Sequence, residues 1–442
     1  MTAVRRKILE YSIGPLGAAL ISLATIPLIA WFYTVHDVAR YTIFQAVIVL
    51  YTLVFCFGLD QAYIREYFDT NNKSLLLKNI IYGVLFPSLG GGLLLFLIFG
   101  KFISVFLYDQ YSFTLLLLTF FSCFFSLLIK ILSSIQRVKD QALLFSLSQF
   151  FPKIIFLILV VLFTFFTKIS FENIIWAQFL SVFFVLLYFL WINKKDIFSA
   201  FKTSLNFLDI KKYYLFGFPL ILTGVVIWGL KLADRFYLKT FSDLEQLGIY
   251  SMAISVASGV IIFSSIFNTI WAPLVYKWAG ETNVKSDFIV EKVESISIKA
   301  SLAICVIIFI LIFFSKLIIF FLPATYSNIY IIIPLCALAP LLYTLSEITG
   351  IGINLMKKTK YTLISCFAAI LVHIVLSFML IPKFGAVGAS VAGGLAFYMF
   401  FLMRTLFSNL LWVKTNFFIT HILTVLSVVI ACFPVLFWWM KL

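Results

Sequence analysis

Long apolar runs follow one another along the whole of this sequence and constrain its fold more than any other feature. A helix needs about 20 apolar residues to cross a bilayer core of roughly 30 Å. The chain has 442 residues, of which 63% are hydrophobic and 12% charged. The apolar runs lie at 8–33, 41–63, 78–100, 113–133, 144–167, 169–192, 213–239, 245–271, 294–321, 328–352, 361–381, 385–403 and 417–440. With short loops between them, they predict an all-α polytopic membrane protein and leave no room for a soluble domain.

The first and the last apolar run each differ from a typical membrane span. The first run is too long for a signal peptide and lacks a small-residue cleavage site, so we expect it to remain as an anchor. The last run contains Pro434 and would add a thirteenth helix to twelve. Whether that C-terminal segment crosses the membrane stays open at the level of sequence.

Basic residues set the predicted orientation. The formal net charge is +15, but most of the 33 Lys and Arg lie in short loops or at helix ends. Basic loops remain in the cytoplasm, so the pattern favours a cytoplasmic N-terminus and argues against nucleic-acid binding. The predicted cytoplasmic clusters are Arg5, Arg6 and Lys7; Arg137 and Lys139; Lys194, Lys195, Lys202, Lys211 and Lys212; and Lys357, Lys358 and Lys360.

The lysine-rich segment 193–212 divides six spans from six. Apolar residues recur in it at helical spacing, as in a helix lying on an anionic leaflet. We therefore predict an N-terminal six-helix lobe at 1–192, an amphipathic cytoplasmic linker at 193–212, a C-terminal six-helix lobe at 213–411 and an extra helix within 412–442.

The two halves share a weak pattern. Pro15 of the first run corresponds to Pro219 of the seventh, and QRVKDQALLFS at 136–146 parallels LMKKTKYTLIS at 355–365. Because each half has an even number of spans, both would have the same orientation, giving a parallel pseudo-twofold repeat with a substrate site between the halves. Chance similarity between apolar segments is the alternative explanation.

No enzyme signature is present in the sequence. The three histidines share no motif, and no phosphate-binding glycine loop or carboxylate pair stands in a sizeable loop. The six cysteines occur singly inside apolar runs, without metal-ligand spacing. We expect a non-enzymatic protein without a cofactor, driven by an H⁺ or Na⁺ gradient or by the substrate gradient.

Ionisable residues within the apolar runs are the candidate site residues, because charge at membrane depth costs about 2.5 to 3.5 kcal/mol each on insertion scales. Lys153 lies about eleven residues, roughly 16 Å, into the fifth run. Pro152 precedes it, so a kink is expected there. The alternative is that the helix starts later and Lys153 reaches the interface. His373 stands at a similar depth in the second half, where it is either functional or structural.

A second group stands in the seventh run. Lys231, Asp234 and Arg235 have the i, i+3, i+4 spacing that places them on one helix face. They lie so far along the run that anchoring at the outer interface competes with a role in a cavity. At the inner side we mark Asp60, Arg65, Lys130 and Glu347. Lys130 and Glu347 hold equivalent repeat positions and would form a pair between the halves that closes the cytoplasmic side; snorkelling is the alternative for these inner groups.

Four short motifs carry a resemblance to a known family. They are GLDQAYIREY at 58–67, LADRFYL at 232–238, LEQLGIYSMA at 244–253 and WAPLVY at 271–276. In this order they resemble polysaccharide flippases of the O-antigen type, in the multidrug/oligosaccharidyl-lipid/polysaccharide (MOP) exporter superfamily. The resemblance covers about residues 8–411. It implies a MATE-like fold of two six-helix lobes around a cationic cavity.

The same resemblance implies a function and a location. The chain would move undecaprenyl-pyrophosphate-linked oligosaccharides across the bacterial inner membrane by alternating access. The substrate-binding cations would be Lys153, Lys231, Arg235, Lys130, Arg65 and His373, with Asp60, Asp234 and Glu347 in ion coupling or gating. Expected partners are the lipid-linked substrate, membrane lipids, a polysaccharide polymerase and a chain-length regulator. The alternatives are a MATE-type drug/cation antiporter and a polytopic polysaccharide polymerase or ligase.

Overall fold

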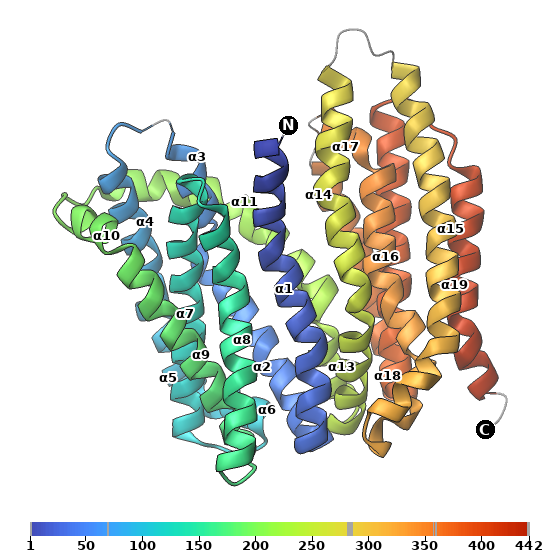
Figure 1. The fold of residues 1–442 in the computed structure, drawn as a ribbon, viewed down its shortest axis with the longest axis horizontal. Coiled ribbons are helices and arrows are strands. Elements are labelled where there is room, and N and C mark those ends of the chain that lie inside the picture. The colour runs from blue at the N-terminus through green and yellow to red at the C-terminus, as the bar shows by residue number, and fades with distance from the viewer. Residues whose placement is uncertain (1, 69, 281–285, 357, 359, 440–442) are drawn as a thin grey trace. The chain divides into compact units, whose positions relative to one another are not determined.

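Helices joined by short turns make up the computed structural model, which describes residues 2–68, 70–280, 286–356, 358 and 360–439 (Figure 1). Within these residues there is no β-strand, and each of the thirteen predicted runs lies on helix. Among the described residues, ten helices are long and apolar enough to cross a membrane, and a bent pair makes an eleventh candidate. One of the ten, α18, contains two predicted runs, while the first run lies on α1 (Thr2–Phe32), whose shorter apolar part is Leu16–Phe32.

The chain divides into two compact units. The N-terminal unit contains Met1–Thr25 and Arg40–Trp228, and the C-terminal unit contains Ile26–Ala39 and Gly229–Leu442. The divisions therefore fall within the first helix, α1 (Thr2–Phe32), the second, α2 (Val35–Cys56), and α11 (Phe207–Leu232). The lobe boundaries drawn at residues 192 and 213 remain a prediction.

The N-terminal unit is built on contacts between α7, α8 and α9, with α3 and α10 packed on α4. A π-helical turn at the glycine-rich stretch joins α4 to α5. The bounds of its remaining elements are α3 (Leu59–Glu66), α4 (Lys73–Pro87), η1 (Ser88–Gly92), α5 (Leu93–Ile98), α6 (Gly100–Tyr108), α7 (Phe113–Val138), α8 (Ala142–Phe166), α9 (Phe171–Ile192) and α10 (Lys194–Phe201).

A close glycine contact fixes the turn between α2 and α3. Phe57 and Gly58 both adopt positive φ angles, 50° and 66°, which end α2 and redirect the chain. Gly58 lies against the backbone of Gly217 in α11, where a side chain on either residue would collide with backbone atoms of the other segment. Gly58 is therefore required for its positive φ angle, and Gly217 because the two backbones approach each other so closely.

The predicted linker helix over 193–212 is shorter than expected. α10 ends at Phe201, and α11 begins at Phe207. Asn206 explains the new start: its side chain accepts a hydrogen bond from the Leu208 N–H at 3.0 Å, while its own N–H donates to Asn79 at 3.1 Å. The apolar face does remain uncovered, since Phe198, Phe207 and Leu208 are exposed.

The C-terminal unit is arranged around α16, which contacts α13, α14, α15 and α18 (Figure 1). α18 is a pair of helices that meet at Gly385, where φ is 50° and ψ is −124°, between the two predicted runs. The C-terminal helix α19 packs on α15. The bounds are α12 (Asp234–Phe241), α13 (Leu244–Ala257), α14 (Gly259–Gly280), α15 (Ser286–Ile318), η2 (Ile319–Phe321), η3 (Ala324–Ile331), α16 (Ile333–Thr349), α17 (Ile351–Leu355), α18 (Lys360–Leu411) and α19 (Phe418–Trp439).

The glycine contact in the N-terminal unit is directly testable. Replacing Gly217 with Ala should destabilise the protein by about 1–3 kcal/mol, since the new methyl group meets the Phe57 backbone. Thermal unfolding of the purified protein in detergent measures the loss. Gly90→Ala is the matched control, because nothing lies within 4 Å of a methyl group there. Equal melting temperatures for the two variants would contradict the packing described.

Candidate functional site

A cavity of about 650 Å³ inside the C-terminal unit collects the charged residues of the seventh predicted run. α11 ends at Leu232 and α12 begins at Asp234, so the predicted single helix is broken at Ala233. Lys231, Asp234 and Arg235 nevertheless line the same cavity. Its other walls come from α13, α14, α16 and α18 and are mostly apolar.

Asp234 is held by two dedicated partners. The residue is 3% exposed, and its two carboxylate oxygens have different donors. The Tyr250 hydroxyl donates to Oδ2 at 2.5 Å, and His373 Nε2 lies 2.6 Å from Oδ1. His373 itself is completely buried, on the helix α18. Buried carboxylates require such partners, since an unmet acceptor costs about 1–3 kcal/mol and more when it is charged.

The two cations of the cavity have no acidic partner. Within the described part of the chain, neither Lys231 nor Arg235 forms a salt bridge. Lys231 places Nζ 4.7 Å from the ring centroid of Tyr343, a cation–π contact. Arg235 has a buried Nη1 atom without any hydrogen-bond partner. Arg235 nevertheless lines the cavity as a residue, so its charge acts on whatever the cavity holds.

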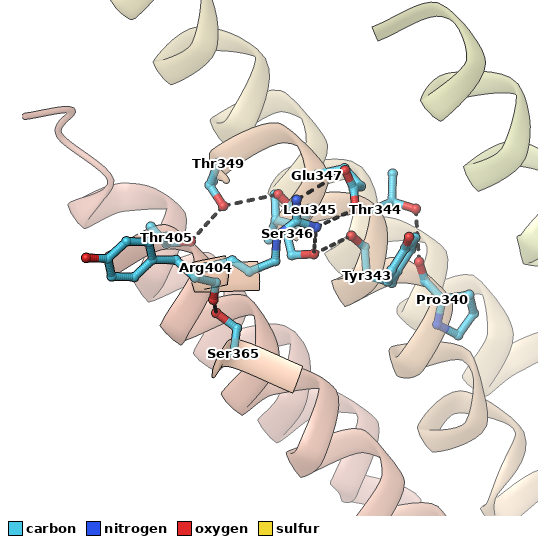
Figure 2. A network of polar contacts seen from close by, with 11 residues as sticks. Pro340, Tyr343, Thr344, Leu345, Ser346, Glu347, Thr349, Ser365, Arg404 and Thr405 are labelled. Carbon is cyan, nitrogen blue, oxygen red and sulfur yellow. Dashed lines mark hydrogen bonds and ion pairs between the residues drawn. The ribbon is translucent and has the colours of Figure 1, made fainter. Parts of the chain in front are cut away.

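The second carboxylate near this cavity is compensated elsewhere (Figure 2). Arg404 of α18 reaches Glu347 of α16 through both terminal nitrogens, with Nη2 3.3 Å from Oε2 and Nη1 bonded to Oε1. Nη1 also donates to Ser346 Oγ at 3.3 Å. Arg404 neutralises the charge of Glu347. The charged residues that line the cavity are then two cations, Lys231 and Arg235, and one carboxylate, Asp234. The site therefore carries net positive charge within an apolar wall.

The N-terminal unit has a smaller cavity of about 310 Å³. Lys130 Nζ lies 3.7 Å from Asp60 Oδ2, and Gln61 donates to the same oxygen at 2.8 Å. Cys56 Sγ donates to the other oxygen at 3.3 Å. Arg137, Gln149 and four serines also line it. Two cations therefore stand against one carboxylate here, as in the cavity of the C-terminal unit, but one of them, Lys130, lies within ion-pair distance of the acid.

The two remaining predicted cations lie apart from both cavities. Lys153 is on an exposed face of α8 and donates to Ser22 Oγ at 2.5 Å and to the Ala18 carbonyl at 3.4 Å, both on α1. α8 continues through Pro152 to Phe166 as one helix. Arg65 is exposed and stacks over the Phe216 ring at 4.7 Å. Neither has an acidic partner in the described residues.

The structure shows contacts for His373, Lys130 and Glu347 that the sequence did not predict. His373 was expected among the substrate-binding cations, but it is fully buried against Asp234 and does not line the cavity, so its direct contact is with that carboxylate. Lys130 and Glu347 were expected to pair across the halves. Each has a partner within its own unit, Asp60 and Arg404, so a pair between them would require both of these contacts to be released.

Sequence reasoning missed Arg404 and Tyr250. Arg404 follows directly after the predicted end of the twelfth run and resembles an ordinary topology-setting charge at a helix end. The signal for Tyr250 was present, because it stands in the LEQLGIYSMA motif, but a motif does not show which residue its hydroxyl meets. In the described chain, no group of three or more His, Cys, Asp or Glu is placed to hold a metal ion.

The sequence matches the model of a known protein family. A family model described as polysaccharide biosynthesis protein matches residues 4–277, which is more than half of the chain. The chain belongs to this family. Among curated proteins, no sequence matches it significantly.

Solved structures show the fold. The lipid II flippase MurJ in an inward closed conformation aligns with a TM-score of 0.69 and 17% identity, over 98% of this chain and 99% of that one. The MATE multidrug transporter DinF-BH in complex with R6G aligns at 0.62 and 17%, covering 91% and 94%. A MOP superfamily transporter from Pyrococcus furiosus aligns at 0.54 and 14%, covering 92% and 96%. These likenesses confirm the predicted MATE-like, all-α polytopic fold class.

The role of His373 as partner of Asp234 gives a stability prediction. His373→Leu should lower stability by about 1–3 kcal/mol, because Asp234 Oδ1 loses its donor in a buried place. Adding Asp234→Asn should recover part of the loss, since the charge is then absent. Thermal unfolding measures both effects, and His36→Leu at an exposed position is the control. A loss that is the same in the single and the double variant would contradict the pairing.

Proposed function

We propose that this protein is a flippase that moves undecaprenyl-pyrophosphate-linked oligosaccharide units of the O-antigen or capsule type. The observation that carries the proposal is the cavity of the C-terminal unit, where neither Lys231 nor Arg235 forms a salt bridge with any residue that the structure describes. Membership of the polysaccharide biosynthesis family and the fold shared with a lipid II flippase support it.

The chemistry of such a cargo explains the need for these cations. A pyrophosphate headgroup with sugars would expose charge and hydroxyl groups to hydrocarbon, at several kcal/mol for each unsatisfied group. Lysine and arginine within an apolar wall replace the lost hydration of the phosphates, and arginine matches phosphate geometry with paired donors. The lipid tail would remain in the bilayer while the helical bundles alternate access. Lys153, Lys130 and Arg65 are the further cations that we assign to this path.

Asp60, Asp234 and Glu347 are the proposed residues for coupling to H⁺ or Na⁺, or for gating. Each accepts hydrogen bonds or ion pairs from identified partners, so protonation of any one would weaken a defined contact. The proposed location is the bacterial inner membrane with a cytoplasmic N-terminus. A polymerase and a chain-length regulator would act on the delivered units.

The MATE-type drug/cation antiporter shares the fold but requires the opposite electrostatics. A cationic drug favours an acidic cavity, whereas the cavity of the C-terminal unit has two cations against one carboxylate that is already hydrogen bonded. We therefore favour an anionic cargo.

Loss of the two cavity cations should stop export. In a strain that depends on this protein for surface polysaccharide, Lys231→Ala with Arg235→Ala should lower the amount of polysaccharide at least about tenfold, because each lost charge-assisted contact contributes about 1.5–3 kcal/mol. Lys316→Ala removes an exposed lysine of α15 and is the matched control. The complete lipid-linked unit should accumulate on the inner leaflet. Accumulation of single units on the outer leaflet would instead indicate a polymerase.

A pair of substitutions tests whether export depends on the positive charge of Lys153. Lys153→Ala should reduce export in the same strain, while Lys153→Arg should retain most of it, because arginine keeps the charge and can still donate to Ser22 and Ala18. Western blotting of the membrane fraction controls for expression. Full export by both variants would remove Lys153 from the proposed path.

A further inference from the structure

Arg404 and Glu347 form an ion pair that the sequence did not predict. Arg404 is among the largest fully buried side chains that the structure describes. Only 2% of Arg404 is exposed, whereas the Glu347 side chain is 24% exposed. Figure 2 shows Arg404 extending from α18 across to α16, where its two terminal nitrogens meet the carboxylate of Glu347. The acid is thus the accessible member of the pair.

The surroundings are shaped for this contact. Gly350 stands directly after α16, and a Cβ atom there would lie 2.9 Å from Arg404 Nε. One residue further along α18, Thr405 shares a 2.6 Å hydrogen bond with Thr349. Arg404 Nε is buried without a hydrogen-bond partner, so the donors of this guanidinium are directed to α16 through its terminal nitrogens. The glycine leaves room for the arginine side chain, and the threonine pair joins α16 to α18 beside it.

Glu347 lies one helical turn from Tyr343, the residue whose ring Lys231 contacts in the cavity. Tyr343 and Glu347 are related by i, i+4 and therefore share a face of α16. Lys231 lies over the ring of Tyr343, 4.7 Å from its centroid, and therefore one turn from Glu347 along α16. Removing one partner of a buried ion pair costs about 3–5 kcal/mol, so without Arg404 the Glu347 carboxylate would be stabilised by pairing with another nearby cation. Lys231 would be that cation.

We propose that Arg404 is a positioning residue that keeps Glu347 away from Lys231, so that Lys231 stays available to an anion in the cavity. Its effect on the cavity is indirect, through Glu347, and Arg404 itself is not among the lining residues. The anion would be the pyrophosphate of the proposed cargo, so this role rests on the proposed function. The pairing preference of Glu347 can be measured independently of any cargo.

The first measurement follows Lys231 itself. The purified protein is labelled with an amine reagent at one alkaline pH, and the rate at Lys231 is read by peptide mass spectrometry. In Arg404→Gln the rate should fall at least about threefold, because pairing with Glu347 keeps the amine protonated. In the double variant Arg404→Gln with Glu347→Gln it should return to the wild-type rate. A structural defect alone would not be reversed by the second substitution, so an unchanged rate, or a fall that persists in the double variant, overturns the proposal.

The second measurement uses inorganic pyrophosphate as the probe. Arg404→Gln should weaken its binding about tenfold, equal to about 1.4 kcal/mol, and the double variant should bind as the wild type does. Glu347→Gln alone should not weaken binding. If the wild type binds no pyrophosphate while the labelling pattern holds, the proposed function fails and the positioning role stands. If the wild type binds but Arg404→Gln changes neither readout, only the positioning role fails.

Arg404→Gln leaves Glu347 uncompensated and could prevent folding, so Arg404→Lys is the second variant. It keeps one positive charge in the site but loses the two-nitrogen contact with the carboxylate. Labelling of Lys231 should then fall by a smaller factor than in Arg404→Gln, and Glu347→Gln should again restore it. A labelling rate equal to wild type in Arg404→Lys, combined with normal melting, contradicts the proposal.

Discussion

A buried carboxylate in an apolar bundle needs hydrogen-bond or ion-pair partners, and this constraint organises the C-terminal unit. Asp234 is held by Tyr250 and His373, and Glu347 is held by Arg404 and lies beside Ser346. These contacts come from α13, α16 and α18, the helices that also form the walls of the cavity. Because these partners are not Lys231 or Arg235, neither cavity cation forms a salt bridge in the described part of the chain. The positive character of the cavity thus follows from where the acids are held.

The N-terminal unit uses the same constraint with a different outcome. Asp60 takes its cation from within its own small cavity, where Lys130 is the nearest basic group at 3.7 Å. Arg137 also lines this cavity, so two cations again stand against one carboxylate, and four serines and Gln149 supply further polar groups. The two cavities therefore have the same formal charge and differ in pairing, since Asp60 lies near a cation of its own cavity whereas Asp234 is held by Tyr250 and His373.

The sequence predicted the fold well, because long apolar runs leave few choices in a bilayer. All thirteen runs lie on helix, and the boundary near 381–385 coincides with the break at Gly385. It also brought Lys231, Asp234 and Arg235 to one place, since near neighbours on a helix share a face even across the break at Ala233. What it could not predict were contacts between distant helices. Arg404 and Glu347 are 57 residues apart, and nothing in either segment indicates the other. The contact of His373 with Asp234 was not predicted for the same reason: it depends on packing that the pattern does not contain.

The central claim is that the protein recognises negative charge on a lipid. The most direct test compares binding of a polyprenyl pyrophosphate with binding of the matching uncharged polyprenol to the purified protein in nanodiscs of neutral lipid. We predict that the pyrophosphate binds at least about tenfold more tightly, with an advantage that shrinks as salt is raised. Equal affinity for the two lipids, or tighter binding of a lipophilic cation than of either, would contradict the account.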